Sequence, residues 1–149
     1  MKRSMKTTLL PLALAVCAAP ALAAPASLMV SDCWVRLLPG ALPSGGYFSV
    51  MNMSAKQVNL VDVQTDAFGM AMLHQTRSNG STSEMVMVEK APVPANGTLK
   101  FAPGGYHLML EQPKHALKVG ESIRMTFVFD DGEKVTSQCA VKSAGATAQ

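Results

Sequence analysis

The sequence predicts an all-β protein, an antiparallel β-sandwich folded as a single domain. The chain has 149 residues, which is the length of one domain, and 48% of them are hydrophobic, too many for a disordered chain. Short segments with apolar residues at alternate positions follow one another along the chain, and no long window has a helical period. Turn sequences such as Asn-Gly and Gly-Gly separate these segments, as they separate the strands of a sandwich.

The N-terminal segment, residues 1–23, has the organisation of a secretory signal peptide. Basic residues come first, an apolar run follows, and small side chains lead up to Ala23. We therefore predict export, cleavage after Ala23, and a mature domain formed by residues 24–149. The alternative, a lipid anchor on Cys17, is disfavoured because Val16 is bulky for the position before a lipidated cysteine.

Removal of this segment changes the charge of the protein. The whole chain has a formal net charge of +3, but residues 24–149 contain ten Lys and Arg and ten Asp and Glu. A neutral mature chain is not typical of a nucleic-acid-binding protein. No other stretch approaches the roughly 18 apolar residues of a membrane span, so we expect no membrane anchor in the mature form.

Two cysteines remain in the mature chain, Cys33 and Cys139. Each alternates with aliphatic residues and should therefore lie on the apolar face of its strand. Export places them in an oxidising compartment, where they can form a disulfide if the first and last strands are neighbours. Two buried free thiols are the alternative. A metal-binding pair is disfavoured, because there is no CxxC motif or Cys/His cluster.

The predicted strands follow one another in a simple order. The first, at 29–37, contains Trp34 and precedes a loop rich in Pro and Gly. The last two are the best defined, because apolar residues alternate strictly in 121–129 and the sequence Asp-Asp-Gly at 130–132 favours a hairpin. The remaining strands are expected at 46–53, 57–65, 69–76, 84–90, 97–102, 105–110 and 134–142.

Three of these strands carry Met or His on the face opposite to their bulky aliphatic residues. In segment 105–110, His107 and Met109 share one face, and Leu108 and Leu110 share the other. The other two strands offer Met85 and Met87, and Met70, Met72 and His74. Thioether and imidazole groups suit Cu(I), whereas Mg²⁺ or Ca²⁺ would require oxygen ligands.

Taken singly, each of these residues has an ordinary explanation. A methionine on a strand usually fills the core, and we assign Met51, Met53 and Met125 to the core on that basis. His115 lies in a loop flanked by Lys114 and is expected at the surface.

The order of the residues is more specific than any one of them. His74 is followed after ten residues by Met85, and after twenty-one more by His107 and Met109. This spacing resembles the signature H-x10-M-x21-H-x-M of the PCu(A)C family of periplasmic copper chaperones. The resemblance extends over nearly the whole mature chain and includes the sequences PANGT at 94–98, PGGYHLM at 103–109, LKVGE at 117–121 and FDDG at 129–132.

The resemblance implies a cupredoxin-like β-sandwich with Greek-key topology that binds one Cu(I) per chain. The implied ligands are His74, Met85, His107 and Met109. The implied role is to carry copper in the periplasm to the Cu(A) subunit of cytochrome c oxidase, or to another copper chaperone. The chain departs from the family in its C-terminal tail, which has no Met or His. A second copper site in that tail is therefore not expected.

Two other functions stay open. A blue-copper electron carrier would need a Cys thiolate with two His and a weak axial Met, and neither mature cysteine has a suitable His beside it in sequence. An interaction module would use the surface of the sandwich without a metal. An enzyme is not indicated, because no motif pairs a nucleophile with a base.

Overall fold

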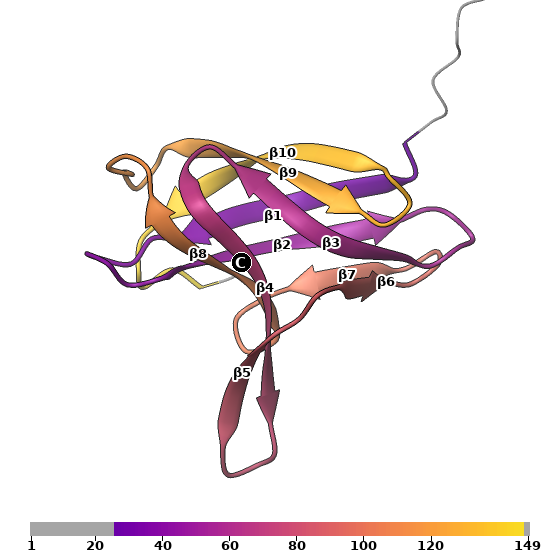
Figure 1. Cartoon of the computed structure of the whole chain (residues 1–149), viewed down its shortest axis with the longest axis horizontal. Helices are drawn as coiled ribbons and strands as arrows, with labels where there is room; N and C mark the ends of the chain where they lie inside the picture. Colours follow the sequence, from indigo (N-terminus) through magenta and orange to yellow (C-terminus); the bar gives the residue numbers. More distant parts are fainter. Residues whose placement is uncertain (1–25, 148–149) are drawn as a thin grey trace, which may run out of the picture.

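The computed structural model describes residues 26–147, and every regular element in this region is a β-strand (Figure 1). No helix able to cross a bilayer is present in this region. The predicted signal peptide, residues 1–23, lies outside the described residues. The strands are β1 (Leu28–Arg36), β2 (Ser44–Asn52), β3 (Val58–Thr65), β4 (Phe68–Ser78), β5 (Ser83–Met87), β6 (Ala91–Val93), β7 (Thr98–Phe101), β8 (Tyr106–Pro113), β9 (Ser122–Phe129) and β10 (Lys134–Lys142).

The strands form one sheet in the order β5-β4-β8-β7-β2-β1-β10-β9-β3-β6. The sheet curls around a single core, so that β3 and β4 come into contact although they stand near opposite ends of this order. The prediction of a single all-β domain is confirmed. Most neighbouring strands are antiparallel, but β1 runs parallel to β10 and β7 parallel to β8, so the sheet is mixed. The Greek-key connection stays a prediction.

Alternation of apolar side chains builds the core as the sequence predicted. In β9, the side chains of Ile123, Met125 and Phe127 are buried, and the residues between them are not. The ring of Phe48 stacks on Phe101 with centroids 4.3 Å apart and packs against Phe127 at 4.5 Å. Each fully buried side chain of this size stabilises the fold by about 1.5–3 kcal/mol.

The first and last strands lie side by side, and a disulfide joins them. Trp34 of β1 pairs with Ala140 of β10. A β-bulge between Ser31 and Trp34 precedes this pairing. Cys33 and Cys139 form a disulfide across it, 106 residues apart in sequence. The predicted bridge is therefore present, and it ties the two ends of the domain together.

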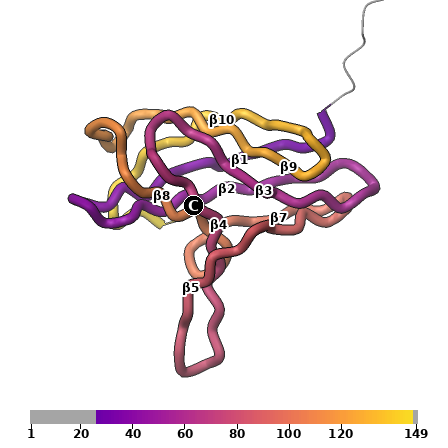
Figure 2. The backbone as a smooth tube through the Cα atoms, viewed as in Figure 1, coloured from indigo at the N-terminus to yellow at the C-terminus, as the bar shows by residue number. Residues whose placement is uncertain are grey.

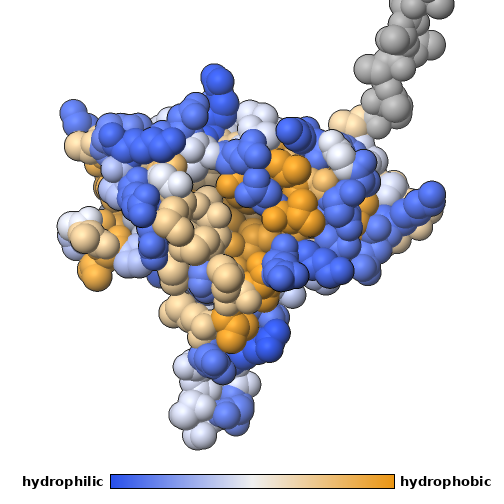
Figure 3. Space-filling view, viewed as in Figure 1, coloured by the Kyte–Doolittle hydropathy of each residue, from blue (hydrophilic) through white to orange (hydrophobic). Residues whose placement is uncertain are grey.

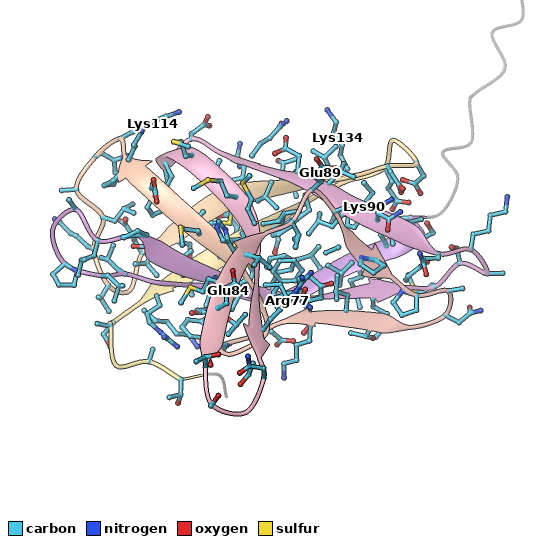
Figure 4. All side chains as sticks on the ribbon, turned by 60° about the horizontal axis from the view of Figure 1, so that its bottom comes forward. Arg77, Glu84, Glu89, Lys90, Lys114 and Lys134 are labelled. Atoms are coloured by element: carbon cyan, nitrogen blue, oxygen red, sulfur yellow. A yellow bond between two sulfur atoms is a disulfide. The ribbon has the colours of Figure 1, made fainter. Side chains whose placement is uncertain are left out.

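Strands β4 and β5 form a hairpin that projects from the body of the sandwich (Figures 1 and 2). Arg77 and Glu84 are cross-strand partners on its two arms (Figure 4). Asn79 holds the turn, because its side-chain oxygen accepts hydrogen bonds from the amide and hydroxyl of Thr82. The tip is hydrophilic, whereas apolar residues gather on the body above it (Figure 3).

The structure differs from the sequence prediction in two respects. Strand β6 was not predicted, because it is only three residues long and contains Pro92, which lacks the N–H of a regular ladder. Met51 and Met53 are exposed, so their assignment to the core was wrong, whereas Met125 is fully buried. The reason is the alternation in β2, where Val50 points into the core and its neighbour Met51 must point outward.

Candidate metal centre

Strands β5, β4 and β8 are adjacent in the sheet and carry the four predicted ligands. His74 of β4 pairs directly with His107 of β8, and Met72 pairs with Met109. On the other side of β4, Thr76 pairs with Met85 and His74 pairs with Met87. Directly paired residues point to the same face of a sheet. Consequently His74, Met85, His107 and Met109 share one face of the sheet. Alternation predicted the face within each strand, and the strand order brings these faces together.

The two histidines form the middle of this arrangement. Their ring centroids are 5.8 Å apart and their planes are inclined by 25°. Met109 and Met85 are both diagonal neighbours of His74, Met109 on β8 and Met85 on β5. They lie in opposite directions along β4 from the pair of histidines. Diagonal neighbours in a sheet are about 7–8 Å apart, a gap that a long methionine side chain can span.

The ligand positions differ in their exposure to solvent. His107 is only 9% exposed, and His74 and Met109 are half-buried. Met85, on the outermost strand of the sheet, is 63% exposed. The imidazoles are therefore held firmly in the sheet, while one thioether is open to contact from outside.

The hydrogen bonds of the two histidines determine which nitrogens are free. The Nδ1 of His107 lies 3.1 Å from the carbonyl oxygen of Gly105. A carbonyl oxygen can only accept, so this Nδ1 carries the proton and Nε2 keeps its lone pair for a ligand. The Nδ1 of His74 is buried and has no hydrogen-bond partner among the described residues. A buried polar atom without a partner is costly, and a bound metal ion held by His74 would offset that cost.

A cavity of about 400 Å³ is lined by three of the four predicted ligands and not by His74. Met85, His107 and Met109 line one side of it. On the other side are Arg36 and Tyr47, which the sequence did not identify as members of the site. No acidic residue is among the lining residues.

Arg36 reaches this cavity because of a glycine. Gly45 pairs with Arg36 on one side and with Met109 on the other, and it has no side chain to separate them. The hydroxyl group of Tyr47 lies over Gly45, where a Cβ atom would be only 2.6 Å from it. The guanidinium carbon of Arg36 lies 5.2 Å from the centre of the Tyr47 ring. The Nε of Arg36 is buried and has no hydrogen-bond partner within residues 26–147.

A larger cavity, of about 540 Å³, adjoins the first one and shares Leu38 and Ser44 with it. It is bordered by Leu42, Phe68, Leu117 and Val119, and by His115, which is exposed as predicted. None of the four predicted ligands lines it. The chemistry of the donor groups, rather than size, favours the smaller cavity as the candidate metal centre.

Comparison with known proteins identifies related sequences. Residues 28–141 match the model of the family described as "Putative lipoprotein LpqE-like". An uncharacterised protein of Rickettsia prowazekii is 35% identical over 89 residues, which are 59% of this chain and 49% of that protein. The "Putative lipoprotein Lxx21020" of Leifsonia xyli subsp. xyli is 33% identical over 113 residues, 75% of this chain and 66% of that protein. The chain thus spans between half and two thirds of the length of these relatives.

Solved structures share the fold. A copper-bound PCuAC domain from PmoF2 superposes with a TM-score of 0.67 at 24% identity, over 81% of this chain and 97% of that one. The solution structure of CuI-DR1885 from Deinococcus radiodurans has a TM-score of 0.64 at 31% identity, over 82% of this chain and 81% of that one. These similarities confirm both the predicted sandwich fold and the family resemblance inferred from the sequence.

Proposed function

The chain belongs to the LpqE-like family, which is the PCu(A)C family, and from this we propose that it is a metallochaperone that binds one Cu(I) at the candidate metal centre. The observation that carries the proposal is the common face shared by His74, Met85, His107 and Met109. We assign these four residues as the ligands. No enzymatic activity is proposed.

The donor groups favour monovalent copper. Thioethers and neutral imidazoles are soft or intermediate ligands that bring no negative charge, so they stabilise Cu(I) more than Cu(II). The positive charge of Arg36 at the same cavity acts in the same direction, because repulsion grows with the charge of the ion. The site would therefore hold copper in the reduced form.

The unequal exposure of the ligands favours transfer. His107 is buried and keeps the ion attached to the sheet, whereas Met85 is open to solvent at the edge strand. A partner could replace the Met85 thioether first and the more buried ligands afterwards. Such stepwise exchange would avoid the release of free copper.

The proposed destination is the Cu(A) centre of cytochrome c oxidase in the periplasm, reached directly or through another copper chaperone. The family resemblance and the predicted export signal at 1–23 support this destination. The family and one relative are described as lipoproteins. For this chain, we propose cleavage after Ala23 and a mature domain without a membrane anchor.

Two alternatives make different predictions. A blue-copper carrier needs a thiolate, but both cysteines of the described region, Cys33 and Cys139, are joined in a disulfide. A strong blue colour with Cu(II) would favour that alternative. A metal-independent interaction module would bind its partner without any affinity for copper.

The proposal is tested by anaerobic competition with a chromophoric Cu(I) chelator. The double variant His107→Ala with Met109→Ala should bind Cu(I) at least about tenfold more weakly than the wild type. His115→Ala is the matched control, because it removes an exposed imidazole that does not line the cavity of the candidate centre. Equal affinities in the wild type and the double variant would contradict the assignment. Transfer of copper to a purified Cu(A) domain would test the destination.

A further inference from the structure

Three exposed methionines lie close together, Met29 on β1, Met51 on β2 and Met53 just beyond the end of β2. Met29 is 46% exposed, Met51 43% and Met53 55%. Methionine side chains are usually buried, so three exposed ones in one place are unusual for a protein surface. None of them belongs to the candidate metal centre, which is on β4, β5 and β8.

The sheet brings the three side chains to one face. Met29 and Met51 are direct cross-strand partners, which places their Cβ atoms about 4.5–5.5 Å apart. Met53 follows Met51 by two residues, and its amide continues the ladder by donating a hydrogen bond to the carbonyl of Ser27 at 2.8 Å. Residues two apart on a strand point the same way and are about 7 Å apart. Three flexible thioethers can therefore converge on one point.

We propose that Met29, Met51 and Met53 form a second site for a soft monovalent metal ion, Cu(I) or its analogue Ag(I). Three thioethers are a soft donor set, and such sets select Cu(I) over harder ions. Met51 and Met53 also border a shallow hollow of about 310 Å³, which gives the ion access from solvent. The absence of an imidazole from this set makes the site weaker than the candidate metal centre.

The two sites are separate. Gly45, the neighbour of Met109, lies near the start of β2, and Met51 lies near its end. Six residues of extended strand span about 20 Å, so no ligand can be shared. The choice of copper as the metal rests on the proposed function. The positions of the three methionines do not depend on it.

The test uses protein labelled with ¹³C at the methionine methyl groups, titrated anaerobically with Cu(I) and, separately, with Ag(I). The wild type should bind two equivalents, the second at least tenfold more weakly, with methyl shifts at Met29, Met51 and Met53. The triple variant Met29→Leu, Met51→Leu, Met53→Leu should bind one equivalent. Leucine keeps the apolar volume, and the melting temperature of the variant checks that it folds.

Two further variants distinguish the possible outcomes. Met70→Leu removes another exposed methionine and should leave the two equivalents intact. The variant His107→Ala with Met109→Ala should lose the stronger equivalent and keep the weaker one, with the same methyl shifts at the trio of Met29, Met51 and Met53.

The inference is overturned if the triple variant binds as many equivalents as the wild type. It is also overturned if the trio shifts no more than Met70, as expected for a surface that only contacts other proteins. Loss of the trio site alone leaves the proposed function intact.

Discussion

His74 and His107 occupy directly paired positions on β4 and β8, with their ring centroids 5.8 Å apart. The separation is set by the hydrogen bonds of the sheet rather than by a loop. A metal ion that binds between them would therefore meet a site that is already formed, and little conformational entropy would be lost on binding.

Replacement of His74 should weaken the centre without unfolding the sandwich. His74→Ala removes one imidazole, whose Nδ1 has no hydrogen-bond partner in the part of the chain that the structure describes. We therefore expect the Cu(I) affinity to fall at least about tenfold while the melting temperature changes little. Gln75→Ala, on the opposite face of the same strand, is the control. A chelator competition and a thermal melt on both variants check this; an unchanged affinity would remove His74 from the ligand set.

Arg36 should influence which oxidation state of copper is held. A fixed positive charge repels Cu²⁺ more than Cu⁺, so Arg36→Gln should raise the affinity for Cu(II) relative to Cu(I), by about fivefold. Lys142→Gln is a matched control, since the Lys142 ammonium, like the Arg36 guanidinium, lies over the Trp34 ring, at 5.0 Å. Lys142 does not line the cavity of the candidate metal centre. The ratio of the two affinities, or the reduction potential, measures the effect. Equal changes in both variants would argue for a general effect of surface charge.

Gly45 should not tolerate a side chain. A Cβ at this position would lie 2.6 Å from the Tyr47 hydroxyl oxygen, so Gly45→Ala must displace the ring. We expect a loss of about 1–3 kcal/mol in the free energy of unfolding. At Gly105 a Cβ would meet only the carbonyl of Ala102 at 3.6 Å, so Gly105→Ala should be tolerated far better. Urea unfolding compares the two, and similar losses would contradict the steric explanation.

The disulfide should stabilise the fold without contributing to metal binding. Replacing Cys33 and Cys139 with Ala should lower the free energy of unfolding by about 2–4 kcal/mol, because the bridge closes a long loop. Cu(I) affinity should be unchanged in the variant, since neither sulfur lies at the candidate centre. A fall in affinity at temperatures where the variant is fully folded would show that the sulfurs do affect the centre.

Asp130 should make the stability depend on acid pH. Hydrogen bonds from the side chain and backbone of Asn59 lower the pKa of Asp130 below its ordinary value of 3.8. A carboxyl group with a lowered pKa in the folded state stabilises the protein above pH 3.8, and this contribution is lost as the pH falls through the folded-state pKa. The difference in urea midpoint between the wild type and Asp130→Asn should therefore shrink in strong acid. A constant difference would contradict this assignment.

Much of the fold could be predicted from periodicity, because burial on one face imposes a period of two. The strict alternation of β9 and the Asp-Asp-Gly turn after it gave the last hairpin correctly. Every predicted strand is present, with ends that differ by at most three residues. Strand β6 was missed because three residues around Pro92 carry too little pattern to be distinguished from a loop.

The candidate site could be predicted only in part. The faces of His107 and Met85 follow from alternation, but their proximity depends on strand order, and β8 lies next to β4 without being its neighbour in sequence. Arg36 of β1 and Tyr47 of β2 reach the cavity because β1 pairs with β2 and β2 pairs with β8, which local sequence does not encode. Met51 and Met53 were misassigned because methionine suits both core and surface, so composition alone does not decide between them.

The parallel pairing of β1 with β10 has a consequence for how the chain folds. The chain is synthesised from its N-terminus, so β1 is made long before β10. The edge of β1 that pairs with β10 stays unpaired until the last strand has been made, more than a hundred residues later. Contacts between such distant segments form slowly, because a large loop must close first. The sandwich can therefore close only after almost all of the chain has been made.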